Sequence, residues 1–266
     1  MFNRLTPVVK NILLVNVGIY LIQSFLNLPL SSWFGLRVVF ADTFAPYQFL
    51  TYMWIHGGFG HLLGNMFAVF IFGPLLEQVW GSKRFLTFYM ITGIGAAAIY
   101  GGVDYMEKRQ LKLDTEAYMQ NPNAEAFSLF IMDHKSPYFR VDVLADFANE
   151  YYENEDDPEY DVRSRSIISS MFEQTSNVPM VGASGAVFGI LMAFAMLFPN
   201  MQLMLLFPPI PVRAKYLVFF YAMFEIYSEI NRAPGDNVAH LAHLGGMLIA
   251  FILLKFFWNN LNQRYY

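Results

Sequence analysis

The sequence predicts an all-α polytopic membrane protein, a bundle of six membrane helices with a partly helical polar insertion between the third and fourth. Three observations support this fold class. Hydrophobic residues make up 56% of the 266 residues and charged residues only 14%, whereas about 25% of the residues in soluble domains are charged. Apolar segments of near-membrane length recur along the chain. Most of the acidic residues are confined to one polar stretch between them.

Six apolar segments are predicted to cross a bilayer: Val9–Leu28, His61–Trp80, Phe85–Gly102, Ser184–Phe198, Tyr216–Ile230 and Val238–Trp258. Several are shorter than the ~20 residues that span a bilayer core of ~30 Å, so we expect other helices to surround them. Basic residues precede the first segment, as they precede a signal peptide, but no small-x-small cleavage site leading to a soluble domain follows. We therefore expect a retained first membrane helix.

Two further apolar stretches are broken by Pro, Gly or Ser, residues 29–58 and residues 199–215. The first carries Trp33, Tyr47 and Trp54, residue types that are enriched where a membrane meets water. The prolines of the second prevent a continuous helix. We expect both stretches to lie in the membrane interface instead of crossing the bilayer.

Charges in the short loops orient the predicted bundle. With a cytoplasmic N-terminus, the cytoplasmic side holds Arg4, Lys10, Lys83, Arg84, Arg213, Lys215 and Arg264, and the short outer loops hold only Arg37 and Arg232. The positive-inside rule therefore predicts that both termini are cytoplasmic. We expect an integral protein of a bacterial inner (plasma) membrane.

Residues 103–178 form the polar insertion, which divides the chain into 1–102 (helices one to three), 103–178 and 179–266 (helices four to six). The insertion holds 16 of the 21 acidic residues and 7 of the 17 basic ones, a net charge of about −9. The orientation places it outside the cell membrane. Apolar residues at helical spacing predict that part of it is helical. It is either a module for substrate recognition or gating, or a spacer without such a role.

Polar residues gather where three of the spans begin on the outer side: His56, His61 and Asn65 in HGGFGHLLGN, Ser184 in VGASGAVFG, and His240 and His243 in NVAHLAHLGG. Ionisable groups near membrane helices are costly and indicate function. The absence of cysteine excludes disulfides and thiol catalysis. The three clusters are therefore the candidate site.

Small residues form matching stripes on two of these spans: Ser184, Gly185 and Gly189 on one, and His243, Gly246 and Ala250 on the other. Such stripes allow close helix approach, which would bring the His243 imidazole to the Ser184 hydroxyl. A serine with a positioned histidine base is an activated nucleophile, even in a dyad without a carboxylate. Gly182 would permit a tight turn before the helix, and Gly185 would leave room for the histidine helix.

His61 and Asn65 are four residues apart and share a helix face. They and the backbone N–H of Ser184 could donate hydrogen bonds to a developing oxyanion. His56 is expected to be a supporting loop residue. His240 is expected to support the loop or a hydrogen bond near His243.

The motifs GASG, HLLGN and AHLGG resemble those of the rhomboid family of intramembrane serine proteases. The resemblance covers all six spans, most clearly residues 45–101 and 179–258. It implies a rhomboid-like bundle, a Ser184–His243 dyad, and cleavage of substrate transmembrane segments near the outer membrane surface. It also implies that His61 and Asn65 lie in the oxyanion site and that Phe188 packs against the catalytic imidazole.

One departure concerns the first loop, where the family's Trp-Arg pair appears here as Tyr47-Gln48. The anchoring of that loop is therefore expected to differ. Glu225 and Glu229 lie one turn apart near the end of the fifth span. They either take part in proton chemistry or face water.

Two alternatives remain beside the serine protease. One is a metal-dependent membrane hydrolase with His56, His61, His240 and His243 as ligands, although no HExxH motif occurs and no carboxylate is expected to accompany the histidine clusters. The other is an inactive relative that binds and escorts membrane proteins. We expect no cofactor, no metal and no nucleic acid. The expected partners are membrane-embedded protein substrates and the lipid bilayer.

Overall fold

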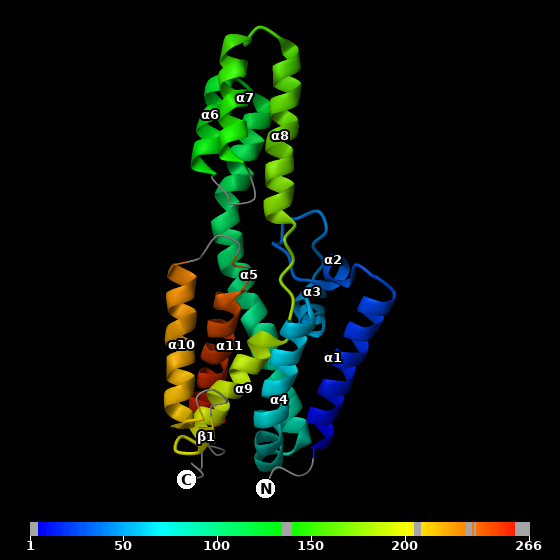
Figure 1. Cartoon of the computed structure of the whole chain (residues 1–266), viewed down its shortest axis with the longest axis vertical. Coiled ribbons are helices and arrows are strands. Elements are labelled where there is room, and N and C mark those ends of the chain that lie inside the picture. The colour runs from blue at the N-terminus through cyan, green and yellow to red at the C-terminus, as the bar shows by residue number, and fades with distance from the viewer. Residues whose placement is uncertain (1–4, 135–139, 205–208, 232–235, 237, 259–266) are drawn as a thin grey trace.

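The computed structural model describes residues 5–134, 140–204, 209–231, 236 and 238–258. It is built mainly of helices that run along its long axis (Figure 1). The lower part is a bundle formed by six helices: α1 (Pro7–Phe25), α4 (Phe59–Trp80), the first half of α5 (Ser82–Gln120), α9 (Ser184–Leu197), α10 (Ala214–Ile230) and α11 (His240–Ile252). A π-helical turn, η2 (Leu253–Phe257), continues α11.

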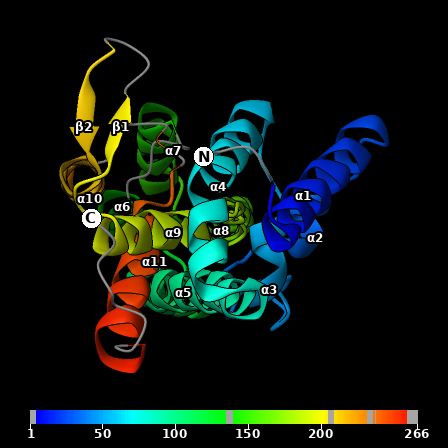
Figure 2. The same ribbon diagram turned by 90° about the horizontal axis from the view of Figure 1, so that it is seen from below.

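Among the described residues, four helices are long and apolar enough to cross a membrane: α1, α4, α5 and the continuous helix His240–Phe257. α9 has only 14 residues, which at 1.5 Å per residue gives about 21 Å. It is surrounded by α4, α5, α10 and α11, and most of its side chains are buried. Figure 2 shows α9 crossing the middle of the bundle. The short apolar segment therefore forms the centre of the core, as expected for a short span.

Local chemistry sets several helix ends. α1 begins with Pro7 in its first turn, where a missing N–H costs nothing. The carboxylate of Glu77, near the end of α4, accepts hydrogen bonds from the N–H groups of Val8 and Val9 at 3.0 Å each. α4 ends at Trp80 and is followed by Gly81, whose φ is 79°, a backbone conformation that favours glycine. This turn leads directly into α5.

The segment between α1 and α4 contains α2 (Leu30–Phe34), α3 (Gln48–Thr51) and the 3-10 turn η1 (Tyr52–Trp54). These short elements sit at the end of the bundle from which α5 extends upward (Figure 1). None of them is a membrane-length helix. The apolar but broken stretch therefore folds as a compact loop.

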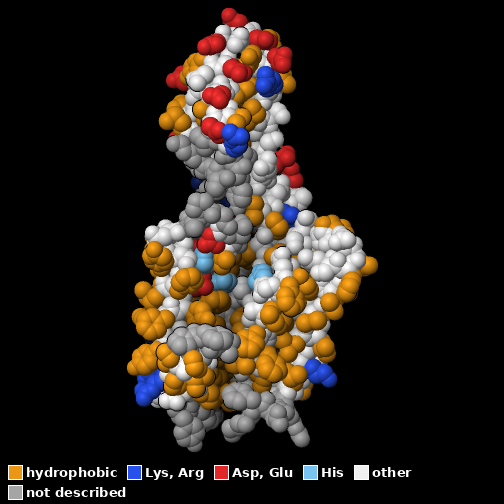
Figure 3. Space-filling model, in the orientation of Figure 1, with side chains coloured by type: hydrophobic (Ala, Val, Ile, Leu, Met, Phe, Trp, Pro, Cys, Tyr) orange, Lys and Arg blue, Asp and Glu red, His pale blue; other side chains and the backbone are white. Residues whose placement is uncertain are grey.

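α5 continues for 39 residues and ends at Gln120, well beyond the expected end of the third span at Gly102. Its upper half packs with α6 (Ala124–Asp133), α7 (Val141–Glu153) and α8 (Pro158–Ser176). These helices share a second apolar core with Phe127, Tyr151 and Ile168 among its fully buried side chains. The side chains of Asn123 and Asp157 cap α6 and α8. The polar insertion is thus largely helical, and acidic side chains gather on its surface (Figure 3).

The stretch after α9 forms an antiparallel hairpin of β1 (Gln202–Met204) and β2 (Pro211–Arg213), with Leu203 opposite Val212. The sequence predicts no strand, so the expected all-α fold is wrong at this hairpin. Prolines had indicated only that a helix is interrupted. The hairpin lies at the end of the bundle where α10 begins.

Candidate active site

Ser184 is the first residue of α9, and the chain that leads to it is held by the first loop. Met180 pairs with Leu36 through two backbone hydrogen bonds of 2.8 and 2.9 Å, and the N–H of Gly182 donates to the carbonyl of Tyr52 at 2.9 Å. Gly182 has a φ of 121°, a conformation that L side chains rarely adopt. The expected tight turn before the serine is therefore present.

Gly182 is also required by its neighbours. A Cβ atom at this position would lie 2.5 Å from Nε2 of His61 and 3.7 Å from Nδ2 of Asn65. The turn before Ser184 is thus in contact with the α4 side chains that were expected to stabilise an oxyanion. The Asn65 side chain is buried, and its Nδ2 has no hydrogen-bond partner among the described residues. A buried amide of this kind is available to a ligand.

α9 and α11 approach each other at their glycines, as the two small-residue stripes predict. A Cβ atom on Gly246 would lie 1.9 Å from the carbonyl oxygen of Gly185. Gly185 itself faces α5 as well, because a Cβ there would lie 2.6 Å from that of Ala96 and 3.4 Å from the carbonyl oxygen of Ala242. The backbone around Ser184 is therefore packed directly against the histidine helix.

His243 is buried in α11 and stacks on Phe188, which lies one turn after Ser184 in α9. The ring centroids are 4.1 Å apart, and the planes differ by 7°. This is the aromatic contact that the family resemblance implied. The ring of the expected base thus lies beside the first turn of the serine helix. The described hydrogen bonds do not include one between Ser184 and His243, and in ligand-free enzymes such bonds are often long.

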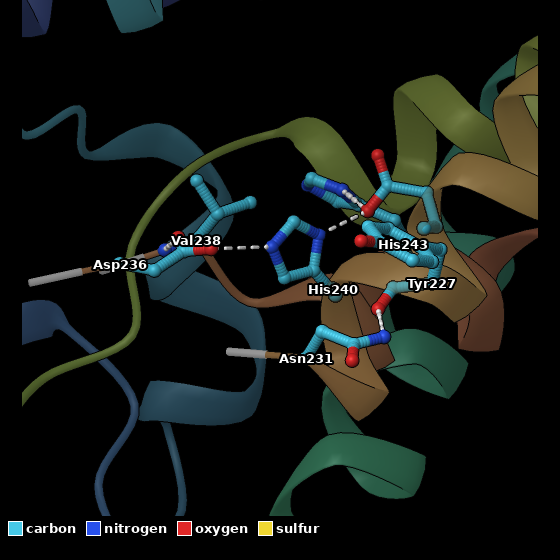
Figure 4. A network of polar contacts seen from close by, with 7 residues as sticks. Tyr227, Asn231, Asp236, Val238, His240 and His243 are labelled. Carbon is cyan, nitrogen blue, oxygen red and sulfur yellow. Dashed lines mark hydrogen bonds and ion pairs between the residues drawn. The ribbon is translucent and has the colours of Figure 1, made fainter. Parts of the chain in front are cut away.

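Glu225 on α10 contacts this imidazole, a contact that the sequence analysis missed. One carboxylate oxygen of Glu225, Oε2, lies 2.9 Å from Nδ1 of His243 and 2.5 Å from Nδ1 of His240. The Nε2 atom of His240 lies 3.1 Å from Oδ2 of Asp236 (Figure 4). Glu225 is only 4% exposed. The expectation that no carboxylate accompanies the histidines is therefore wrong, as is the reading of Glu225 as facing water.

His56 is fully buried in the loop before α4, and its ring lies 5.1 Å from that of His61 in an edge-to-face arrangement. Burial, together with the neighbouring His61, lowers the pKa of His56 to about 4. Its carbonyl accepts a hydrogen bond from Nε2 of Gln23 on α1. The ring of His56 thus packs against the ring of His61, as expected for a loop residue that supports the site.

The four histidines of the metal alternative do not form one group among the described residues. The side chains whose ligand atoms lie within 4.8 Å of one another are Glu225, His240 and His243. His56 and His61 are not part of that group. Histidine side chains nevertheless occur at one level of the bundle, just below the upper helices (Figure 3).

The first loop is anchored by residues other than a Trp-Arg pair. Arg37 is buried, and its guanidinium donates to the carbonyls of Asn177 and Ser32. Gln48 is fully buried, accepts from the N–H of Arg37 and donates to the carbonyl of Thr43. The Tyr47 hydroxyl donates to the carbonyl of Trp33. Arg37 therefore ties the loop to the segment that leads to Ser184.

Comparison with known proteins identifies a family that fits this geometry. A family model described as "Rhomboid domain" matches residues 43–108 and 162–260, and leaves out residues 109–161 in the upper helices. "Rhomboid-like protein 11, chloroplastic" of Arabidopsis thaliana is 34% identical over 87 residues, which are 32% of this chain and 29% of that protein. "Putative rhomboid protease YdcA" of Bacillus subtilis (strain 168) is 36% identical over 103 residues, 35% of this chain and 48% of that protein. The chain thus matches less than half of the length of these relatives.

Proposed function

The chain belongs to the rhomboid family, and from this premise we propose that it is an intramembrane serine endopeptidase that cleaves transmembrane segments of other proteins. Ser184 is the proposed nucleophile and His243 the proposed base. The observation that carries the proposal is the stack of the His243 imidazole on Phe188, one turn from Ser184, at the close contact between α9 and α11.

In the proposed mechanism, Oγ of Ser184 attacks the scissile carbonyl while its proton moves to Nε2 of His243. The other ring nitrogen, Nδ1, is already in contact with Glu225, so Nε2 is the nitrogen left for the serine. The protonated imidazole then gives the proton to the leaving amine, and an acyl-enzyme remains. Water resolves the acyl-enzyme by the same route in reverse.

An oxyanion would form beside the N-terminus of α9. The first N–H groups of a helix have no partner within it, and the N–H of Ser184 is one of them. The amide of Asn65 and the ring of His61 contact the preceding turn at Gly182. Each well-placed donor to an oxyanion contributes about 3 kcal/mol of transition-state stabilisation. The unpartnered Nδ2 of Asn65 supports this role.

In the proposed arrangement, α1, α4, the lower part of α5, α9, α10 and α11 with η2 are the six membrane spans. The chain divides into residues 1–102, the acidic insertion 103–178 and residues 179–266. The termini are cytoplasmic and the insertion lies outside. The supporting observation is that α1 begins and α11 ends at the same end of the bundle, away from the upper helices (Figure 1). A bacterial inner membrane is the proposed location.

The proposed substrates are membrane-embedded proteins whose spans unwind readily near the outer surface. A helix hides its carbonyls in hydrogen bonds, so a protease must open it before attack. Gly and Pro lower the cost of opening by about 1–3 kcal/mol each. Substrates with such residues near the cleavage point should be cut faster than matched substrates without them.

The test uses the full-length chain in liposomes with a model transmembrane substrate and a serine-reactive fluorophosphonate probe. Wild type should cut the substrate and take up the probe, whereas Ser184→Ala and His243→Ala should do neither. A Ser184→Ala variant that still cuts would reject the serine mechanism. A wild-type protein that binds the substrate, leaves it intact and takes up no probe would indicate an inactive escort protein.

A further inference from the structure

Resting on the proposed function, we propose that Glu225 is the positioning residue of the catalytic base, and that it completes a Ser184–His243–Glu225 triad. The dyad expected from the sequence has no acid. The structure brings a carboxylate from α10, forty-one residues after the serine, to the Nδ1 atom of His243.

The first argument is that stacking alone leaves the imidazole incompletely oriented. Phe188 contacts the flat face of the His243 ring, with the planes 7° apart. A half-turn of the ring about its Cβ–Cγ bond preserves that stack and moves both nitrogens to the opposite edge. The contact between Nδ1 and Oε2 of Glu225, at 2.9 Å, distinguishes the two orientations. Glu225 therefore selects the one in which Nε2 is free for Ser184.

The second argument concerns the proton on the ring. A carboxylate only accepts hydrogen bonds, so the Nδ1 atom of His243 must donate to it. A neutral imidazole with its proton on Nδ1 carries its lone pair on Nε2. That tautomer is the one that can take the serine proton. Glu225 thus fixes the tautomer as well as the orientation of the base.

The third argument is that Glu225 is itself held in place. Its Oε2 atom also contacts Nδ1 of His240, and Nε2 of His240 contacts Asp236. Both nitrogens of His240 therefore face carboxylate oxygens, which matches an imidazolium that donates from each. Glu225, His240 and His243 are all at least 92% buried. An isolated buried carboxylate is costly, and the two imidazoles offset that cost.

The proton balance of the step is closed within the site. The Oγ–H proton of Ser184 moves to Nε2 of His243 as the Oγ–carbonyl carbon bond forms. His243 becomes an imidazolium that keeps its Nδ1 proton, and Glu225 stays ionised and stabilises that charge. The Nε2 proton then passes to the leaving nitrogen as the peptide C–N bond breaks. Glu225 gains and loses no proton.

The test compares wild type with Glu225→Gln and Glu225→Asp in the same liposome assay. Glu229→Gln, one turn later on α10, is the matched control. Glu225→Gln should lower kcat about 100-fold with KM changed less than about threefold, because loss of the acid in a serine triad mainly affects the chemical step. Glu225→Asp should recover about tenfold of that loss, and Glu229→Gln should match wild type. An unchanged kcat for Glu225→Gln, with Ser184→Ala inactive, would overturn this inference and leave the proposed function intact.

A second readout does not depend on activity. In protein with ¹⁵N-labelled histidine and a Ser184→Ala background, the His243 signal should report a proton on Nδ1. Adding Glu225→Gln should move that proton to Nε2 for a large share of the molecules, with the thermal midpoint used to check that the variant is folded. A His243 tautomer that is the same with Glu225 and with Gln would overturn the positioning role. Inactive wild type that shows the expected tautomer shift would instead reject the proposed function alone.

Discussion

The imidazole of His243 lies face to face with the ring of Phe188, with centroids 4.1 Å apart and planes 7° apart. Two helices that are far apart in sequence are joined at this stack, and the serine lies one turn above it on α9. Phe188→Leu keeps an apolar side chain but removes the flat face. Since aromatic pairs contribute about 0.5–1.5 kcal/mol beyond area burial, we expect kcat for a model substrate to fall about 3–10-fold. Phe188→Tyr should stay near wild type, and an equal loss in both variants would argue against stacking as the cause.

α9 and α11 lie close together at Gly246. Gly246→Ala would place a Cβ atom 1.9 Å from the Gly185 carbonyl oxygen, so the helices must separate. Overpacking of this kind costs about 1–3 kcal/mol, and we expect a lower thermal midpoint and little cleavage. Intrinsic tryptophan fluorescence in detergent provides the measurement. Gly102→Ala is the matched control because a Cβ there has no neighbour within 4 Å. If both variants melted alike, the helix contact would not be as tight as described.

His56 makes stability depend on pH. Burial lowers its pKa to about 4 in the folded protein, whereas in an unfolded chain the pKa of histidine is about 6.5. Between about pH 4 and pH 6.5 the unfolded state therefore binds more protons than the folded state. The contribution of His56 to the free energy of unfolding is thus complete above about pH 6.5 and is lost as the pH falls toward 4. His56→Gln should show a smaller drop of the thermal midpoint between pH 7 and pH 4.5 than wild type. Parallel curves for the two proteins would contradict this assignment.

Chelation separates the serine mechanism from the metal alternative. Glu225, His240 and His243 have the residue types of a metal site, but Oε2 of Glu225 already contacts the Nδ1 atoms of both histidines. We expect cleavage to be unchanged after dialysis against EDTA. Loss of activity that zinc restores would favour the hydrolase alternative and would assign these three residues as ligands.

The upper helices should tune the choice of substrates, not the chemistry. The aromatic ring of Phe40 contacts Tyr105 on α5 and Phe172 on α8. The two helices that connect the lower bundle to the upper core therefore lie close together at this point. Replacing residues 106–171 by a short Gly-Ser linker should therefore preserve the lower bundle and its uptake of the serine probe. We expect relative cleavage rates to change across a panel of substrates. Unchanged rates for every substrate would show that the segment is a spacer.

The sequence predicted the parts of the site that depend on short-range pattern. Ser184 at the first residue of α9 and the tight turn at Gly182 follow from one short segment, and the contact between Gly246 and Gly185 follows from the small-residue stripe that each of two short segments carries. Glu225 could not be found in this way, because its contact with His243 depends on how two antiparallel helices are rotated. The sequence offers one signal for this contact, which is the similar distance of both residues from the connection between the two helices. Glu225 lies five residues before the end of α10, and His243 lies three residues after the start of α11.

The length of α5 was missed for a different reason. Hydropathy falls after Gly102, but 12 of the next 18 residues are Lys, Glu, Leu, Arg, Gln, Met or Ala, which are strong helix formers. No proline occurs between Gly102 and Pro122. Hydropathy therefore predicts a span that ends near Gly102, whereas helix propensity continues beyond it. The hairpin of β1 and β2 is not predicted, because its prolines indicate only that a helix is interrupted.

Because α5 is uninterrupted, one continuous helix connects the upper core to the lower bundle. The helix is about 58 Å long at 1.5 Å per residue over its 39 residues, and its lower half touches Gly185 on the serine helix through Ala96. Along this connection, any sideways load on the upper core is transmitted through a continuous hydrogen-bonded helix, whereas the connection from α8 to α9 is a loop. A ligand that tilts the top of this helix must strain either the helix or the packing beside the nucleophile.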